Sequence, residues 1–161
     1  MHDSTSDREA TRSAEPAPSD RAGLNTADGQ LAYAVLRAAF GVNILMHGAA
    51  RLGSLASFVD GVAAGFADTF LPDTLVRGFA WLIAPAELLL GLAILAGLKT
   101  RAALLAGSTL MLMLTIGVTL QQRWDVAGLQ LTYFVVYALL IGGLGLNRWS
   151  VDGWLARRRS S

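Results

Sequence analysis

Four apolar segments, each long enough to cross a lipid bilayer, constrain this chain more than any other feature. They cover about residues 30–50, 75–98, 102–120 and 126–146. A helix needs about 20 predominantly apolar residues to cross the hydrocarbon core of a membrane. Glu87 is a charged residue in the middle of the second segment, and the third and fourth segments contain no charged residue. The sequence therefore predicts an all-α fold, an integral membrane four-helix bundle.

The composition agrees with this class of protein and excludes several kinds of chemistry. Hydrophobic residues make up 53% of the 161 residues, and charged residues make up 16%, whereas soluble domains carry about 25% charged residues. The chain has no cysteine, which excludes disulfides and thiolate ligands within it. We expect no metal site and no nucleic-acid partner, and any electron transfer requires a bound small molecule or another protein.

The chain is expected to divide into three parts. Residues 1–28 contain almost no large apolar side chains, so burial cannot offset the entropy cost of ordering them, and a disordered cytoplasmic tail is predicted. Residues 29–147 form the predicted transmembrane domain, and residues 148–161 form a basic cytoplasmic segment. Within the short turn after the second segment, Gly97 suits a left-handed helix end, and Thr100 is expected to cap the next helix.

The longest connection, residues 51–74, carries an apolar stripe with helical spacing. An amphipathic helix is expected there. It either lies in the membrane interface or covers the outer end of the bundle, and the sequence leaves both interpretations open. The stripe consists of Leu55, Phe58, Val59, Val62 and Phe66.

Basic residues near the segment ends predict the orientation in the membrane. Cytoplasmic loops of inner-membrane proteins carry an excess of Lys and Arg. One side holds the tail, Lys99, Arg101, Arg148 and residues 157–159, whereas the other holds Arg51, Arg77 and Arg123. We therefore expect a multi-pass protein of the bacterial inner membrane with both termini cytoplasmic, and lipid headgroups as partners of the terminal arginines.

Polar residues at membrane depth are the candidate functional residues, because ionisable groups in hydrocarbon are costly and need partners. Arg37, Asn43, His47 and Arg51 fall on one face of the first helix, given about 100° per residue. Counting along the second helix places Glu87 near the depth of Asn43. Glu87 is therefore expected within reach of Arg37, and a buried ion pair between the two is one interpretation of these residues.

The fourth segment adds a second set of polar residues toward the outer side. Gln130, Tyr133 and Tyr137 follow one another at nearly one helical turn. We expect a polar pocket in the outer half, with Glu87 at its floor and His47, Arg51 and Gln130 at its rim. The candidate ligand-binding residues are Arg37, Asn43, His47, Arg51, Glu87, Gln130, Tyr133 and Tyr137.

Two interpretations of these residues remain open from the sequence. In one, the polar groups only fix the register of the helices and hydrogen-bond between them. In the other, His47 and Glu87 are the candidate catalytic groups and exchange protons beside a lipid-soluble quinone, since quinone reduction consumes protons and His titrates near neutral pH.

The chain resembles the DoxX family of small bacterial membrane proteins between about residues 31 and 154. The resemblance rests on residues 36–37, Gly41, 46–48 and 51–52, then 87–88, 91–92 and 95–101, and finally 143–145 and 149–152. It implies a four-helix membrane bundle and a link to membrane-associated redox complexes, one branch being similar to the membrane subunit of thiosulfate:quinone oxidoreductase. It also implies that His47, Arg51 and Glu87 are the positions to test, with Arg37 as the charge partner of Glu87.

Together these observations favour a redox-associated inner-membrane subunit that binds quinone or docks a soluble oxidoreductase. A non-catalytic scaffold that assembles partner proteins is the alternative, and a small-molecule transporter is the third. Whether the chain forms a homo-oligomer stays open.

Overall fold

Four long apolar helices form the body of the protein in the computed structural model, which describes residues 26–159. These helices are α1 (Thr26–Gly53), α3 (Asp73–Ala96), α4 (Thr100–Leu120) and α5 (Trp124–Gly142). Shorter elements are α2 (Leu55–Gly65), the 3₁₀ helix η3 (Leu144–Leu146) and α6 (Val151–Arg159). The predicted all-α fold with four membrane-spanning helices and a helix in the outer connection is confirmed.

Two helix boundaries differ from the sequence-based expectation. Helix α1 begins at Thr26, so the last residues of the predicted tail 1–28 belong to this helix, and residues 1–25 lie outside the described part. Helix α5 ends at Gly142 rather than at residue 146, and the chain continues through η3. Most of the basic segment 148–161 is helical, because α6 extends to Arg159.

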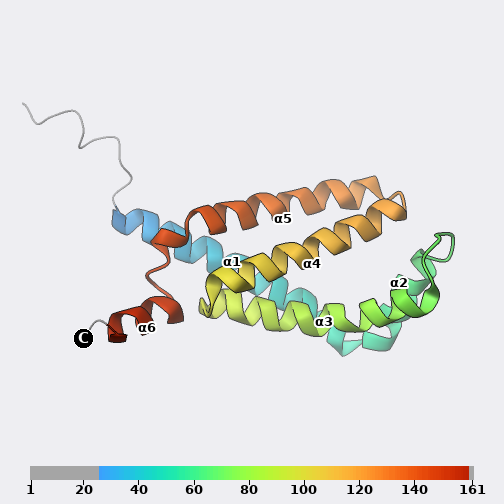
Figure 1. The fold of residues 1–161 in the computed structure, drawn as a ribbon, viewed down its shortest axis with the longest axis horizontal. Helices are drawn as coiled ribbons and strands as arrows, with labels where there is room; N and C mark the ends of the chain where they lie inside the picture. Colours follow the sequence, from blue (N-terminus) through green and yellow to red (C-terminus); the bar gives the residue numbers. More distant parts are fainter. Residues whose placement is uncertain (1–25, 160–161) are drawn as a thin grey trace, which may run out of the picture.

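The helices are arranged as two pairs (Figure 1). Helix α1 packs along α3, while α4 and α5 form an antiparallel hairpin that contacts α3 through α4. Helix α2 packs on α3 at the end of the molecule opposite α6. We call the end with α2 the outer end and the end with α6 the inner end.

Glycines bring α1 and α3 into backbone contact. A Cβ atom on Gly41 would lie 2.6 Å from the amide nitrogen of Leu95, and one on Gly91 would overlap the backbone of Leu45. Gly48 faces the backbone of Leu88 in the same way. Small residues allow such close approach in lipid, where helices associate through packing rather than through the hydrophobic effect. The positions of these glycines therefore fix the register between the two helices.

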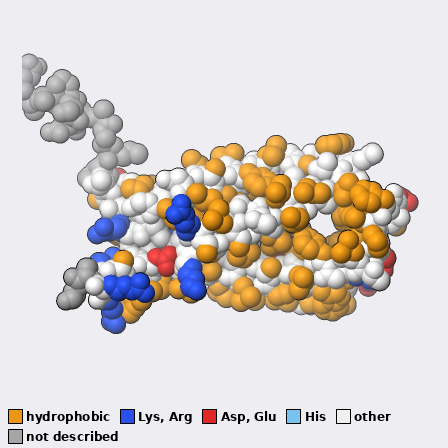
Figure 2. Space-filling model, in the orientation of Figure 1, with side chains coloured by type: hydrophobic (Ala, Val, Ile, Leu, Met, Phe, Trp, Pro, Cys, Tyr) orange, Lys and Arg blue, Asp and Glu red, His pale blue; other side chains and the backbone are white. Residues whose placement is uncertain are grey.

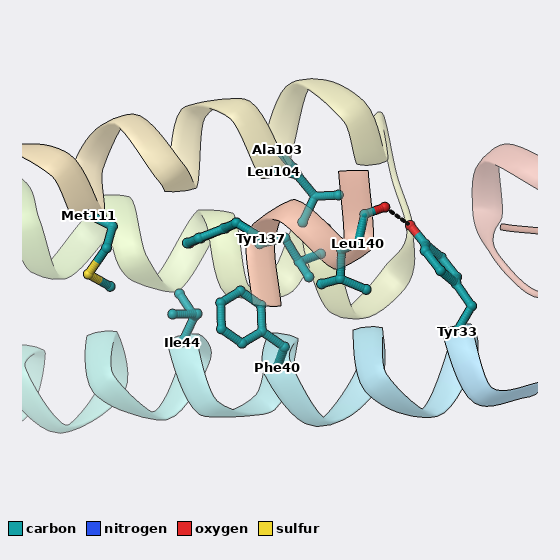
Figure 3. Close-up of a cluster of buried hydrophobic side chains, with 9 residues drawn as sticks. Tyr33, Phe40, Ile44, Ala103, Leu104, Met111, Tyr137 and Leu140 are labelled. Atoms are coloured by element: carbon teal, nitrogen blue, oxygen red, sulfur yellow. Dashed lines mark hydrogen bonds between the residues drawn. The ribbon is translucent and has the colours of Figure 1, made fainter. Parts of the chain in front are cut away.

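The main apolar core lies in the inner half of the bundle (Figure 3). The ring of Phe40 from α1 meets the ring of Tyr137 from α5 edge-on, with 4.8 Å between the centroids. The hydroxyl of Tyr33 donates a hydrogen bond of 3.1 Å to the carbonyl of Leu140. Leu104 and Met111 of α4 complete this cluster. The inner half is therefore closed by large side chains from α1, α4 and α5.

Arg37 fastens the inner end of the bundle. Its guanidinium donates hydrogen bonds to the carbonyls of Ile94 at 2.6 Å and Leu95 at 2.5 Å, and also to the carbonyl of Trp149 at 2.8 Å. The last carbonyls of a helix have no partner within it. Arg37 therefore caps the end of α3 and ties the C-terminal segment to it.

Asp152 caps the start of α4 from the far end of the chain. Its carboxylate accepts hydrogen bonds from the amides of Lys99 at 2.8 Å and Thr100 at 2.7 Å, and from the hydroxyl of Thr100 at 2.7 Å. Gly97 has the expected left-handed conformation, with φ of 66°. The prediction that Thr100 caps the helix was wrong, because Thr100 is the first helical residue and its hydroxyl is itself a donor to Asp152.

The glycine contact between α1 and α3 predicts a strong stability effect. Gly91→Val should lower the free energy of unfolding in detergent by about 2 kcal/mol or more, because the added side chain has no space beside Leu45. Gly78→Val is the matched control, since a Cβ atom at this position of the same helix meets nothing within 4 Å. Thermal unfolding of both variants tests this, and equal losses would contradict the assignment.

The contribution of Asp152 to stability should depend on pH. Burial acts to raise the pKa of this carboxyl, but the hydrogen bonds from Thr100 and Lys99 and the charge of Arg37 outweigh it and lower the pKa. The stabilisation is therefore complete above the unfolded-state pKa of about 3.9 and is lost as the pH falls through the lower folded-state value. Asp152→Asn should reduce the melting temperature at pH 7, and the difference from wild type should shrink below about pH 4. A difference that grows in acid would refute this.

Candidate functional site

A cavity of about 680 Å³ opens at the outer end between α2, α3, α4 and α5. Figure 2 shows the molecule hollowed on this side, at the end away from the cluster of basic residues. Apolar side chains from these helices form most of its wall, among them Phe58, Val62, Phe66, Phe79, Ile83, Met113 and Val126. Cavities of about 300–1,000 Å³ with mainly apolar walls and a few polar groups are typical of small-molecule sites.

Helix α2 closes the outer side of this cavity. Val59 and Ala63 are buried where α2 packs on α3. The ring of Phe66 lies close to α4, since a Cβ atom on Gly117 would be 3.2 Å from it. Helix α2 thus covers the bundle end, in agreement with the second of the two interpretations of the apolar stripe.

Arg77 holds α2 in place. Its guanidinium donates to Asp60 of α2 at 2.6 Å and to Asp73 of α3 at 2.8 Å. All three groups are largely exposed to the surroundings of the bundle. This network fixes the position of α2 but contributes little stability by itself, because exposed ion pairs are worth about 0–1 kcal/mol.

The few polar groups in the cavity wall include Arg51 and Gln130. The Oε1 atom of Gln130 is buried and has no hydrogen-bond partner within residues 26–159. A buried amide oxygen without a partner costs about 1–3 kcal/mol, so such an atom usually meets a ligand or water. Gln130 is thus the clearest acceptor for a ligand in this cavity.

Arg51 forms an ion pair with Glu87 beside the cavity. The side chain of Glu87 is only 7% exposed, while that of Arg51 is 28% exposed and lies over the ring of Phe58 at 5.0 Å. The second carboxylate oxygen of Glu87, Oε2, is buried without a partner in the described part of the chain. The carboxylate and the guanidinium therefore bring a charged, incompletely satisfied pair to the cavity's edge.

The predicted ion pair between Arg37 and Glu87 was wrong. Counting residues from the segment ends placed Glu87 at the depth of Asn43, whereas the contact of Gly48 with Leu88 places Glu87 farther out, near Arg51. Arg37 lies at the inner end and binds backbone carbonyls instead. The register set by the glycines therefore decides which arginine neutralises the carboxylate.

A second polar cluster lies between α1 and α5, outside the cavity. The hydroxyl of Tyr133 donates to Oδ1 of Asn43 at 3.1 Å, and Nδ1 of His47 is 2.8 Å from the Asn43 carbonyl. The rings of His47 and Tyr133 meet edge-on with centroids 6.4 Å apart. Because a carbonyl only accepts, Nδ1 of His47 carries the proton, and Nε2 remains available on an exposed side chain.

The structure thus separates residues that the sequence placed in one pocket. Arg51 and Gln130 line the cavity, and Glu87 lies directly behind Arg51. Asn43, His47 and Tyr133 form the separate cluster, Tyr137 belongs to the inner core, and Arg37 caps α3. Sequence reasoning did not assign Phe58 and Phe66 to the site, although the apolar stripe of α2 was the signal for them.

The comparisons with known proteins identify a family. A family model described as methylamine utilisation protein MauE matches residues 29–128, and the chain belongs to this family. The match covers the chain from α1 to the first turns of α5. No curated protein and no solved structure shows a significant match.

The assignment to the DoxX family was therefore wrong. Several residues that suggested it, such as Gly41, Gly91 and Gly97, serve close packing and the turn after α3. Such roles recur wherever membrane helices pack closely, so these residues did not discriminate between families. The MauE match supports a membrane protein with a redox-associated role in general, and it extends neither to DoxX nor to quinone binding.

The ion pair beside the cavity predicts asymmetric effects of its two neutral variants. Arg51→Gln should cost about 3 kcal/mol of stability, because it leaves the buried Glu87 carboxylate without a partner. Glu87→Gln should cost less, since the more exposed Arg51 can reach water or headgroups.

The double variant should be more stable than the sum of the two losses predicts. A double-mutant cycle from thermal unfolding in detergent measures this coupling. Strictly additive effects would show that the two side chains do not interact in the folded protein.

Proposed function

We propose that this member of the MauE family is the membrane component of a redox-associated system, and that its outer cavity binds a lipid-soluble quinone for a docked soluble oxidoreductase. The observation that carries the proposal is the buried amide oxygen of Gln130, which has no hydrogen-bond partner in the described part of the chain and lies in a largely apolar cavity wall that also includes Arg51. The family description adds methylamine utilisation as the process that such a system would serve.

The polar groups of the cavity suit both oxidation states of a quinone. A quinone carbonyl accepts hydrogen bonds, and the guanidinium of Arg51 can donate one. A hydroquinone hydroxyl donates, and Oε1 of Gln130 can accept that bond. The aromatic rings of Phe58, Phe66 and Phe79 would contact the ring and the first part of an isoprenoid tail.

The chain itself would supply binding and proton exchange rather than electrons. It contains no cysteine, so electrons would pass between the quinone and a partner enzyme at the membrane surface. Glu87 lies next to Arg51, and one of its buried oxygens has no partner among residues 26–159, which makes it the nearest group to exchange a proton with the bound molecule.

Quinone binding to the purified chain tests this proposal. Isothermal titration in detergent with a benzoquinone that bears a decyl tail should give saturable binding by wild type. With the same molecule reduced to its hydroquinone, Gln130→Leu should weaken binding about tenfold, because the hydroxyl loses its buried acceptor. Gly61→Phe should abolish it, since Gly61 lines the cavity and a side chain there enters open space.

Gly128→Phe is the matched control for the cavity-filling variant. This glycine also has open space around it, but it does not line the cavity, so binding should equal that of wild type. Wild type that binds no quinone, or a Gly61→Phe variant that binds as well as wild type, would refute the proposal.

A scaffold without a ligand of its own is the second candidate. The internal partners of Arg37 and Arg51 favour it, because both arginines already perform structural roles. The scaffold predicts that Gly61→Phe supports methylamine-dependent growth of a deletion strain as well as wild type does, at equal protein level. Lost growth with this variant and normal growth with Gly128→Phe would exclude it.

A further inference from the structure

A second hollow, of about 540 Å³, lies at the inner end between the start of α4, η3 and α6. Three arginines and one carboxylate supply its charged groups: Arg101, Arg148, Arg157 and Asp152. Leu144 and Ala156 add an apolar part to the wall. The hollow is thus lined by several basic side chains together with apolar ones, whereas the wall of the outer cavity is largely apolar.

The backbone around Gly153 builds this groove. A Cβ atom on Gly153 would overlap the carbonyl of Arg148, so α6 folds back tightly on the turn that precedes it. Arg157 donates a hydrogen bond of 3.1 Å from α6 to the same carbonyl. The fold therefore brings arginines from α4, from the turn between η3 and α6, and from α6 around one space.

The carboxylate of Asp152, which lies in the groove, already accepts hydrogen bonds from the protein. Both oxygens of Asp152 accept hydrogen bonds from Lys99 or Thr100. By contrast, neither Arg101 nor Arg148 forms an ion pair within residues 26–159. Arg101 and Arg148, both exposed, therefore face the groove without a carboxylate partner and can bind an anion.

The position of the groove indicates where the anion comes from. Trp149 and Trp154 are exposed beside it, and exposed tryptophans of membrane proteins concentrate at the headgroup level. Figure 2 shows Lys and Arg side chains gathered at this end of the apolar bundle. Basic residues near an anionic membrane surface are attracted to its headgroups.

We propose that this inner-end groove is a binding site for one anionic phospholipid, with the headgroup phosphate held by Arg101 and Arg148. The acyl chains then extend from Leu144 along the apolar surface of the bundle. The site is independent of the outer cavity, because the two hollows share no residue and lie at opposite ends.

Native mass spectrometry of the full chain in detergent tests the site, with phosphatidylglycerol and phosphatidylcholine as probes. Wild type should retain one phosphatidylglycerol molecule and bind phosphatidylcholine at least about tenfold more weakly. Arg101→Gln combined with Arg148→Gln should weaken phosphatidylglycerol binding by about tenfold or more.

Arg158→Gln combined with Arg159→Gln is the matched control, because it removes the same charge from α6 outside the groove. Arg158 stacks on Trp154 at 3.8 Å, and neither residue lines the hollow. This variant should bind phosphatidylglycerol within about threefold of wild type.

Two results would overturn the proposal. Equal losses in the two double variants would show general attraction to basic residues rather than a site. Displacement of the lipid by inorganic phosphate at comparable concentration would show a site for the free anion rather than for a lipid headgroup.

Discussion

The backbone contact between α1 and α3 determines the rest of the structure. Gly41, Gly48 and Gly91 allow the two helices to approach very closely. These contacts fix the register between α1 and α3. In lipid this contact is stabilised by packing, so a shift of one turn would place side chains where only hydrogen atoms fit. The register then brings Arg51 to Glu87 and Arg37 to the carbonyls at the end of α3.

The two halves of the bundle differ in how their polar groups find hydrogen-bond partners and in how closely they are packed. At the inner end, Arg37 and Asp152 cap helix ends and bind the C-terminal segment to the bundle. Next to them, toward the middle of the bundle, aromatic rings from α1 and α5 fill the space between the helices. At the outer end, buried apolar residues of α2 and α3 such as Val59, Val76 and Ile83 pack together but leave the cavity open toward α4 and α5, and α2 covers the bundle there. A closely packed inner half thus adjoins an outer half with space for a ligand.

The sequence was sufficient to predict the four long helices and α2, but not η3, α6 or the contacts between the elements. Apolar length gave the four spans, and the stripe at Leu55, Phe58 and Val59 gave α2, because both signals are local. The partner of Glu87 depends on helix register, which hydropathy does not contain. The cap of α4 comes from Asp152, 52 residues away from Thr100, and no local pattern points to it. For the same reason only Arg51 and Gln130 of the predicted site residues line the cavity.

The central claim is that a lipid-soluble quinone occupies the outer cavity, and photolabelling tests it most directly. A photoreactive azidoquinone would be added to the full chain in lipid nanodiscs, illuminated, and the labelled residues mapped by peptide mass spectrometry. We predict labels on the wall formed by α2, α3 and α4, at residues such as Phe58, Phe66 and Ile83, that excess unlabelled quinone prevents. Labels confined to the exposed cluster at His47 and Tyr133, or labels that excess quinone does not reduce, would contradict the claim.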